Sequence, residues 1–105
     1  MKTVVQIPHH EYSAAVRANV EERLHQLLHY YERIVSLRAV LERQSNLHRV
    51  ELVANVGRHA ILVVNARAGA LEAAIDEALG RMRTILERHK GKRVDRRRRA
   101  DRGKR

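Results

Sequence analysis

The segment of residues 69–92 constrains the fold more than any other part of the chain. Its apolar residues recur at steps of three and four, the period of an α-helix with one buried face. They are Leu71, Ala74, Ile75, Ala78, Leu79, Met82, Ile85 and Leu86. Arg81, Arg88 and Lys92 follow one another at intervals of seven and four. The sequence therefore predicts a long helix that buries one side and presents a stripe of cations along its border.

The residues before this helix predict a small sheet and a second helix. Residues 2–7 are rich in β-branched side chains and are followed by Pro8, as expected of a first strand. A helix is expected over residues 14–31, with Ser13 as its N-cap. Three segments then alternate with a period of two, which predicts strands at residues 34–43, 49–56 and 60–66.

Two details of these strands depend on which face each residue takes. Val35, Leu37, Ala39 and Leu41 are expected to share the buried face of the second strand. Both faces of the fourth strand are fairly apolar, so its register stays open. Gly57 is expected to begin a tight hairpin turn with a positive φ angle.

Together these elements predict an α+β fold in the order β-α-β-β-β-α. The first crossover makes strands one and two parallel, and the short connections that follow make the remaining strands an antiparallel meander. The result is a four-stranded mixed sheet with both helices packed on one face. Gly91 is expected to end the folded domain of residues 1–91. Residues 92–105 form an Arg-rich basic tail with too little apolar surface to fold alone, and this tail is expected to be disordered.

The positive charge is concentrated in that tail. The chain has a net charge of +10, and residues 91–105 hold nine Lys or Arg against two Asp. Residues 1–90 hold thirteen against ten carboxylates. A polyanionic partner is the natural inference, with nucleic acid ahead of membrane, whereas a purely solubilising tail is the simpler alternative.

The sequence offers little for catalysis or metal binding. It has no Cys, no nucleophile elbow and no phosphate-binding glycine loop. His25 and His29 are one helical turn apart, yet no third ligand stands at a recognisable spacing. We therefore expect no enzyme activity, no cofactor, no metal and no small-molecule substrate. Without a membrane span or a signal-peptide pattern, a cytoplasmic protein with no membrane partner is expected.

The cations of the two helices favour binding to a nucleic-acid backbone. Arg17 and Arg23 lie on the borders of the apolar stripe of the first helix, although border arginines can also serve only to cover apolar surface with their stems. The chain has three Tyr and no Phe or Trp, so an aromatic platform for single-stranded bases is missing. Recognition of backbone and shape in folded or duplex RNA is the expected mode.

Several short stretches resemble the ribosome hibernation factors, of the short hibernation-promoting and ribosome-associated inhibitor type. The resemblance covers residues 2–92, and its matching pieces are AVR at 15–17, RL at 23–24, Tyr30, RI at 33–34, AAID at 73–76, RM at 81–82 and LERHKGK at 86–92. Three parts of the chain depart from the family pattern: Gln26 and Thr84 replace basic residues, and residues 70–72 replace the usual entry to the last helix. The Arg-rich tail is also not a usual feature of the family.

This resemblance implies a non-catalytic translation inhibitor that binds the small ribosomal subunit near the decoding centre and preserves idle ribosomes. It implies rRNA contacts by Arg17, Arg23, Arg81, Arg88, Lys90 and Lys92. The tail residues Arg93, Arg96, Arg97, Arg98 and Arg99 are candidates for further RNA contacts. No second, dimerising domain is recognised, so a monomer is expected. The alternative is a general RNA- or nucleic-acid-binding module driven by the basic tail.

Overall fold

The structure, a computed structural model, describes residues 2–7, 12–57 and 60–103, and within them the side chains from residue 3 to residue 89. The elements follow the order β1 (Lys2–Gln6), α1 (Ala14–Tyr30), β2 (Ser36–Gln44), β3 (Leu47–Asn55), β4 (Ile61–Ala68) and α2 (Leu71–Gly103). The predicted α+β class and the β-α-β-β-β-α order are confirmed. No helix in the described ranges has a stretch long and apolar enough to cross a membrane.

The four strands form one mixed sheet in the order β1-β2-β3-β4. β1 runs parallel to β2, with Val5 opposite Ala39, while β2, β3 and β4 pair antiparallel. Both β1 and β4 are edge strands, since each has a single neighbour in the sheet. The predicted crossover and meander are thus both present.

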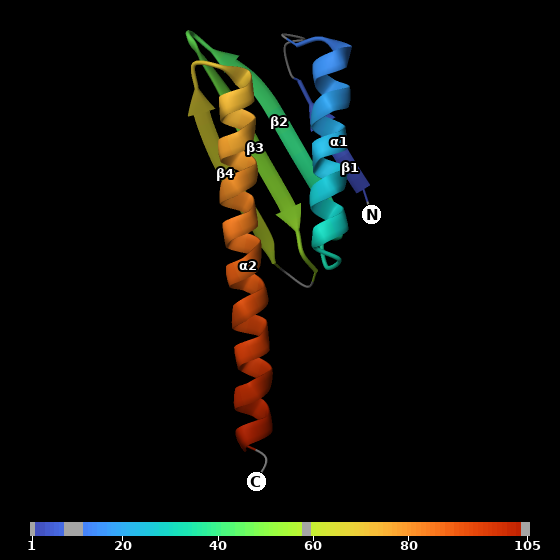
Figure 1. Ribbon diagram of the computed structural model, residues 1–105, viewed down its shortest axis with the longest axis vertical. Helices are drawn as coiled ribbons and strands as arrows, with labels where there is room; N and C mark the ends of the chain where they lie inside the picture. The colour runs from blue at the N-terminus through green and yellow to red at the C-terminus, as the bar shows by residue number, and fades with distance from the viewer. Residues whose placement is uncertain (1, 8–11, 58–59, 104–105) are drawn as a thin grey trace.

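Both helices cover the same face of this sheet, as Figure 1 shows. α1 packs on β1 and β2, and α2 packs on β3 and β4. α2 has 33 residues, so at 1.5 Å per residue it is about 50 Å long and continues well past the sheet (Figure 1). Neither of the two described helices lies on the other face of the sheet (Figure 1). We call it the open face, and its residues include Arg38, Val53, Ile61, Val63 and Arg67.

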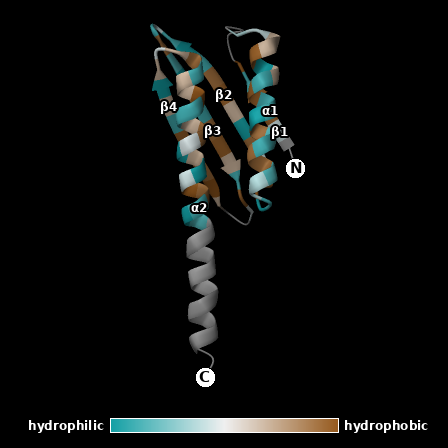
Figure 2. Cartoon of the chain, viewed as in Figure 1, coloured by the Kyte–Doolittle hydropathy of each residue, from teal (hydrophilic) through white to brown (hydrophobic). Residues whose placement is uncertain are grey.

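The core lies between the helices and the sheet and is almost entirely aliphatic. Its largest fully buried side chains are Leu24, Leu27, Ile34, Leu37, Leu41, Leu52, Met82 and Val50. Figure 2 shows hydrophobic segments along β2 and β3 and on both helices. Among the described side chains no polar or charged residue is buried, so hydrophobic burial is the main source of stability.

Local chemistry explains the helix start and the hairpins. Ser13 is the N-cap of α1 as predicted, and its Oγ accepts a hydrogen bond from the backbone N–H of Val16 at 3.2 Å. Ser45 turns the chain between β2 and β3 with φ at 57°. Gly57 has φ at 100°, a conformation that favours glycine, which confirms the predicted turn residue after β3.

Three expectations about element limits and faces need correction or completion. Val35, which was expected on the buried face, is 54% exposed. Ile34 is buried in its place, with 1% exposure. The reason is that β2 begins only at Ser36, after the N–H of Ile34 has bonded to the carbonyl of Tyr31 at 3.1 Å. In β4, the register left open by the sequence places Val64 inward and Val63 outward.

The end of α2 also differs from the expectation. The helical backbone continues through Gly91 to Gly103, so a C-cap at Gly91 is wrong. A glycine inside a helix costs only about 1 kcal/mol relative to alanine, and the lysines and arginines around it are good helix formers. The division into a folded domain of residues 1–91 and a disordered tail of residues 92–105 stays a prediction.

Candidate RNA-binding surface

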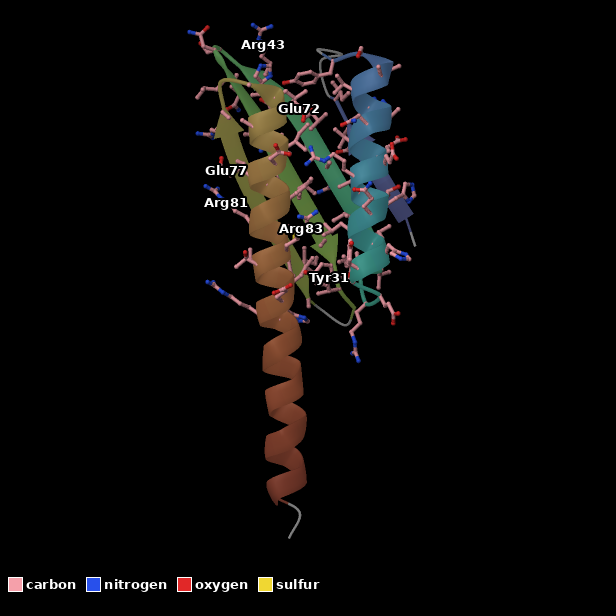
Figure 3. The ribbon with its side chains drawn as sticks, viewed as in Figure 1. Tyr31, Arg43, Glu72, Glu77, Arg81 and Arg83 are labelled. Carbon is pink, nitrogen blue, oxygen red and sulfur yellow. The ribbon has the colours of Figure 1, made fainter. Side chains whose placement is uncertain are left out.

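Helix α2 presents its cations on two different sides. Its buried positions include Ala74, Ala78 and Met82, which confirms the predicted apolar face. At 100° per residue, Arg81 and Arg83 point about 200° apart. Figure 3 shows Arg81 on the β4 side of α2 and Arg83 on the side that faces α1. Arg88 is seven residues after Arg81 and therefore returns to the Arg81 side.

Arg81 is held by the protein itself. One guanidinium nitrogen donates to the carboxylate of Glu77 at 2.5 Å, and the other donates to the backbone carbonyl of Asn65 at 2.5 Å. Asn65 lies in the edge strand β4, so the arginine covers an acceptor at that edge. Of the predicted stripe of Arg81, Arg88 and Lys92, Arg81 is therefore engaged within the fold, Arg88 has no partner among the described residues, and the side chain of Lys92 lies outside them.

Arg17 covers a backbone carbonyl at the opposite edge of the sheet. Its guanidinium donates a hydrogen bond to the backbone carbonyl of Val5 in the edge strand β1 at 2.5 Å. Because exposed strand edges are templates for pairing with other chains, arginines at both edges protect the sheet. Neither Arg17 nor Arg81 is a freely available cation in this structure.

Arg23 links the two helices instead of facing solvent alone. It donates to the carboxylate of Asp76 and lies 3.6 Å from a carboxylate oxygen of Glu72. Its side chain is 26% exposed, whereas those of the two acids are 62% and 75% exposed. The Arg23 charge is therefore neutralised locally, and its clearest contribution is to hold α1 beside α2.

A second link between the helices lies near the end of α1. The hydroxyl of Tyr31 donates to the carboxylate of Glu87 at 3.1 Å. Partial burial raises the pKa of Tyr31, and the hydrogen bond and negative charge of Glu87 raise it further, while nearby Arg83 acts in the opposite direction. Arg83 therefore lies close to the junction of the two helices, as Figure 3 shows.

Arg83 and Arg88 are the helix-layer cations best placed for an external ligand. Both side chains are exposed, and neither has a hydrogen bond or ion pair with any residue that the structure describes. Arg33, just after α1, is also exposed and unpaired in the same sense. Arg88 was expected as a contact from the sequence. Arg83 was not, because a single stripe at intervals of seven and four leaves it out.

The remaining predicted contacts lie in the second half of α2. Lys90, Lys92, Arg93, Arg96, Arg97, Arg98 and Arg99 have helical backbone, and their side chains lie outside the described residues. Charge divides sharply along the chain. Residues 12–33 and 71–89, which contain the helix layer, carry six Arg and seven carboxylates, whereas residues 90–105 carry ten Lys or Arg and two Asp.

His25 and His29, the candidate metal ligands of the sequence, contact other side chains in the structure. Nε2 of His25 lies 3.4 Å from the hydroxyl of Thr3, and the ring of His29 packs edge-on near Tyr30. Among the described residues, no group of three or more His, Cys, Asp or Glu is arranged to hold a metal ion.

The fold and the layout of its charge define a class: a small α+β domain with two helices on one sheet face and a basic helical extension. A family model described as sigma 54 modulation protein / S30EA ribosomal protein matches residues 3–94. The chain belongs to this family, which confirms the resemblance seen in the sequence. No curated protein matches the chain.

Two solved structures have similar folds. A ribosomal subunit interface protein from Coxiella burnetii has a TM-score of 0.77 at 15% identity, over 87% of this chain and 99% of that chain. The N-terminal domain of Protein Y from Thermus thermophilus has a TM-score of 0.67 at 26% identity, over 84% of this chain and 94% of that chain. The first likeness concerns the fold alone.

Proposed function

We propose that the protein is a non-catalytic, ribosome-binding hibernation factor that docks on rRNA of the small subunit near the decoding centre and inhibits translation. Membership of the S30EA ribosomal protein family supports the ribosome as the partner. The similar fold of a protein named for the ribosomal subunit interface is consistent with this partner.

The observation that carries the RNA contact is the separation of engaged from unpaired arginines. A phosphate gains most from a cation that is not already neutralised by a carboxylate, because no existing ion pair has to be broken. Arg83 and Arg88 meet this condition within the helix layer. The backbone of α2 continues past Lys90 and Lys92 to Gly103, and residues 90–105 of the sequence hold ten Lys or Arg. We therefore assign RNA binding to the segment of α2 from Arg83 onwards, which presents cations on more than one side of the helix.

Arg17, Arg23 and Arg81 stay predictions as RNA contacts. Their guanidinium groups are bound to Val5, to Asp76 and Glu72, and to Glu77 and Asn65. In the proposed mechanism these arginines hold the two helices and the sheet edges in place. They fix the helix backbone that carries the unpaired cations, so little backbone ordering has to accompany binding.

The second candidate is a general RNA-binding module driven by residues 92–105. The charge concentration in this segment favours it, since a long basic helix can follow any nucleic-acid backbone. The two proposals differ in what the folded domain contributes: a specific ribosomal position in the first, and only a scaffold in the second.

The test is co-sedimentation of purified protein with purified small and large ribosomal subunits, with and without mRNA and tRNA. The proposed function predicts binding to small subunits, weak binding to large ones, and displacement by mRNA with tRNA. Equal binding to both subunits and to unrelated RNA supports the second candidate. No sedimentation with either subunit contradicts both.

A further inference from the structure

The open face of the sheet carries exposed aliphatic residues that the fold does not use. Ile61 is 63% exposed and Val63 is 49% exposed, and both project from the edge strand β4 on the side away from the helices. Val53 lies directly opposite Val63 on β3 and is half-buried. These three residues form an aliphatic ridge, which is the name used below. Apolar groups of this kind gain nothing from contact with water or with sugar-phosphate.

Two unpaired arginines flank the aliphatic ridge. Arg38 lies opposite Val53 on β2, and Arg67 lies on β4 four residues beyond Val63. Both side chains are exposed and have no ion pair or hydrogen bond within the described part of the chain. They are available to carboxylates of a partner.

The acids of the same face are already engaged. Arg49 lies 3.6 Å from Glu42 and 3.0 Å from Glu51, and it also donates to the side-chain carbonyl of Asn65 at 2.8 Å. The side chains of this network are only 19–26% exposed. A second copy of the chain that docked through its own open face would bring the same engaged acids to the interface, so it would leave Arg38 and Arg67 without partners.

The composition of the face also argues against RNA as its occupant. Its described strands offer aliphatic side chains where a single-stranded nucleic acid would need aromatic rings for stacking. Arg67 lies directly opposite Arg49, whose charge is neutralised by Glu51, and Arg38 lies opposite Val53. The described strands therefore carry no continuous row of free cations across this face. A protein surface with aliphatic side chains flanked by Asp or Glu matches both features.

We propose that the open face docks a protein segment of this kind, and that in the ribosome complex the segment belongs to a ribosomal protein. This inference rests on the proposed function, which brings the chain to a particle made of RNA and protein. The unpaired cations of α2 then bind RNA, while the aliphatic ridge and its two arginines bind protein. The chain would thus use two surfaces for two kinds of macromolecule.

Site-specific photo-crosslinking tests this assignment. A benzophenone amino acid replaces Val63 in one variant and Gln26 in a matched control, since Gln26 is exposed on α1. Each variant is bound to purified small subunits, irradiated and digested, and the joined fragments are identified by mass spectrometry. The proposal predicts that position 63 joins a ribosomal-protein peptide containing aliphatic and acidic residues, and that position 26 does not join that peptide.

Crosslinks from position 63 to rRNA or to a second copy of the chain would overturn the proposal. So would the absence of a protein crosslink from a complex that still sediments with small subunits. Failure to sediment at all would instead contradict the proposed function, so the two failures are distinguishable.

A pair of substitutions adds an independent measurement. Arg38→Glu with Arg67→Glu should weaken binding to small subunits about tenfold, because two attractive contacts become repulsive. The melting temperature should change little, since neither arginine has a partner in the described fold. Unchanged affinity in this double variant would also overturn the proposal.

Discussion

Two pairs of arginines from different regions of the molecule, Arg23 and Arg81 in the helix layer and Arg38 and Arg67 on the open face, differ in what holds them. In the helix layer, Arg23 and Arg81 are bound to carboxylates of α2. On the open face, Arg38 and Arg67 stand unpaired within the described structure, beside exposed aliphatic residues. The comparison shows that a cation near an apolar stripe is not by itself a binding residue. Its value to a ligand depends on what already holds it.

The same contrast applies to apolar residues and gives the largest expected effect on stability. Met82→Ala removes a side chain with 0% exposure and should lower the free energy of unfolding by about 2–5 kcal/mol. Val63→Ala, on the 49% exposed position of the open face, should change it by less than about 0.5 kcal/mol. Chemical denaturation of both variants measures the difference. Equal losses would mean that the open face is covered in solution.

The next largest effect is expected on ribosome binding, when the second half of α2 is removed. Deleting residues 93–105 removes eight Lys or Arg and two Asp, and we expect binding to small subunits to weaken by at least about tenfold. The thermal unfolding midpoint should stay close to that of the full chain, because the buried residues of α2 among the described side chains lie at or before Leu86. Retained preference for small over large subunits supports the proposed function, whereas loss of all binding favours the tail-driven module.

Much of the fold can be predicted from the sequence because it follows from periodicity. The spacing of Leu71 to Leu86 defines the buried face of α2, and the alternation around Val50 defines that of β3. Val35 was placed wrongly because alternation alone does not show at which residue a strand begins. The end of α2 was placed wrongly because a glycine is compatible with both a C-cap and a continuing helix.

The engagement of the arginines could not be predicted in the same way. Arg23 and Asp76 are 53 residues apart in the sequence, and their contact depends on which side of α1 faces α2. Arg81 reaches a backbone carbonyl of β4, an acceptor that every residue possesses and that no sequence pattern marks. The one sign in the sequence that Arg81 would be engaged is Glu77, which stands four residues before it, at the spacing of a helical ion pair.

A smaller effect is expected from the link between the helices. Arg23→Ala should lower the free energy of unfolding by about 1 kcal/mol or less, because the ion pair with Asp76 is only partly shielded from solvent. A double-mutant cycle with Asp76→Ala should give a coupling energy of about 0.5–1 kcal/mol. A coupling energy of zero would mean that Arg23 is free to bind a ligand, and that the two regions do not differ in this respect.

The smallest effect involves Tyr31. Tyr31→Phe removes the hydrogen bond to Glu87 and should lower the free energy of unfolding by about 0.5 kcal/mol at neutral pH. Because the pKa of Tyr31 is raised above 10.0 in the folded chain, its contribution is complete below pH 10 and is lost as the pH rises through the folded value. The stability difference between the two proteins should therefore narrow above pH 10. A constant difference would contradict the link.

The most direct measurement is the salt dependence of small-subunit binding by the full chain and by a variant with Arg83→Gln and Arg88→Gln. If both unpaired arginines contact phosphates, the slope of log affinity against log salt becomes shallower by about 0.7–0.9 for each of them. A matched variant with Arg17→Gln and Arg81→Gln should keep the steep slope, because these two arginines are engaged within the fold. A slope that is flat for the full chain, or that falls only in the Arg17 and Arg81 variant, would contradict the account.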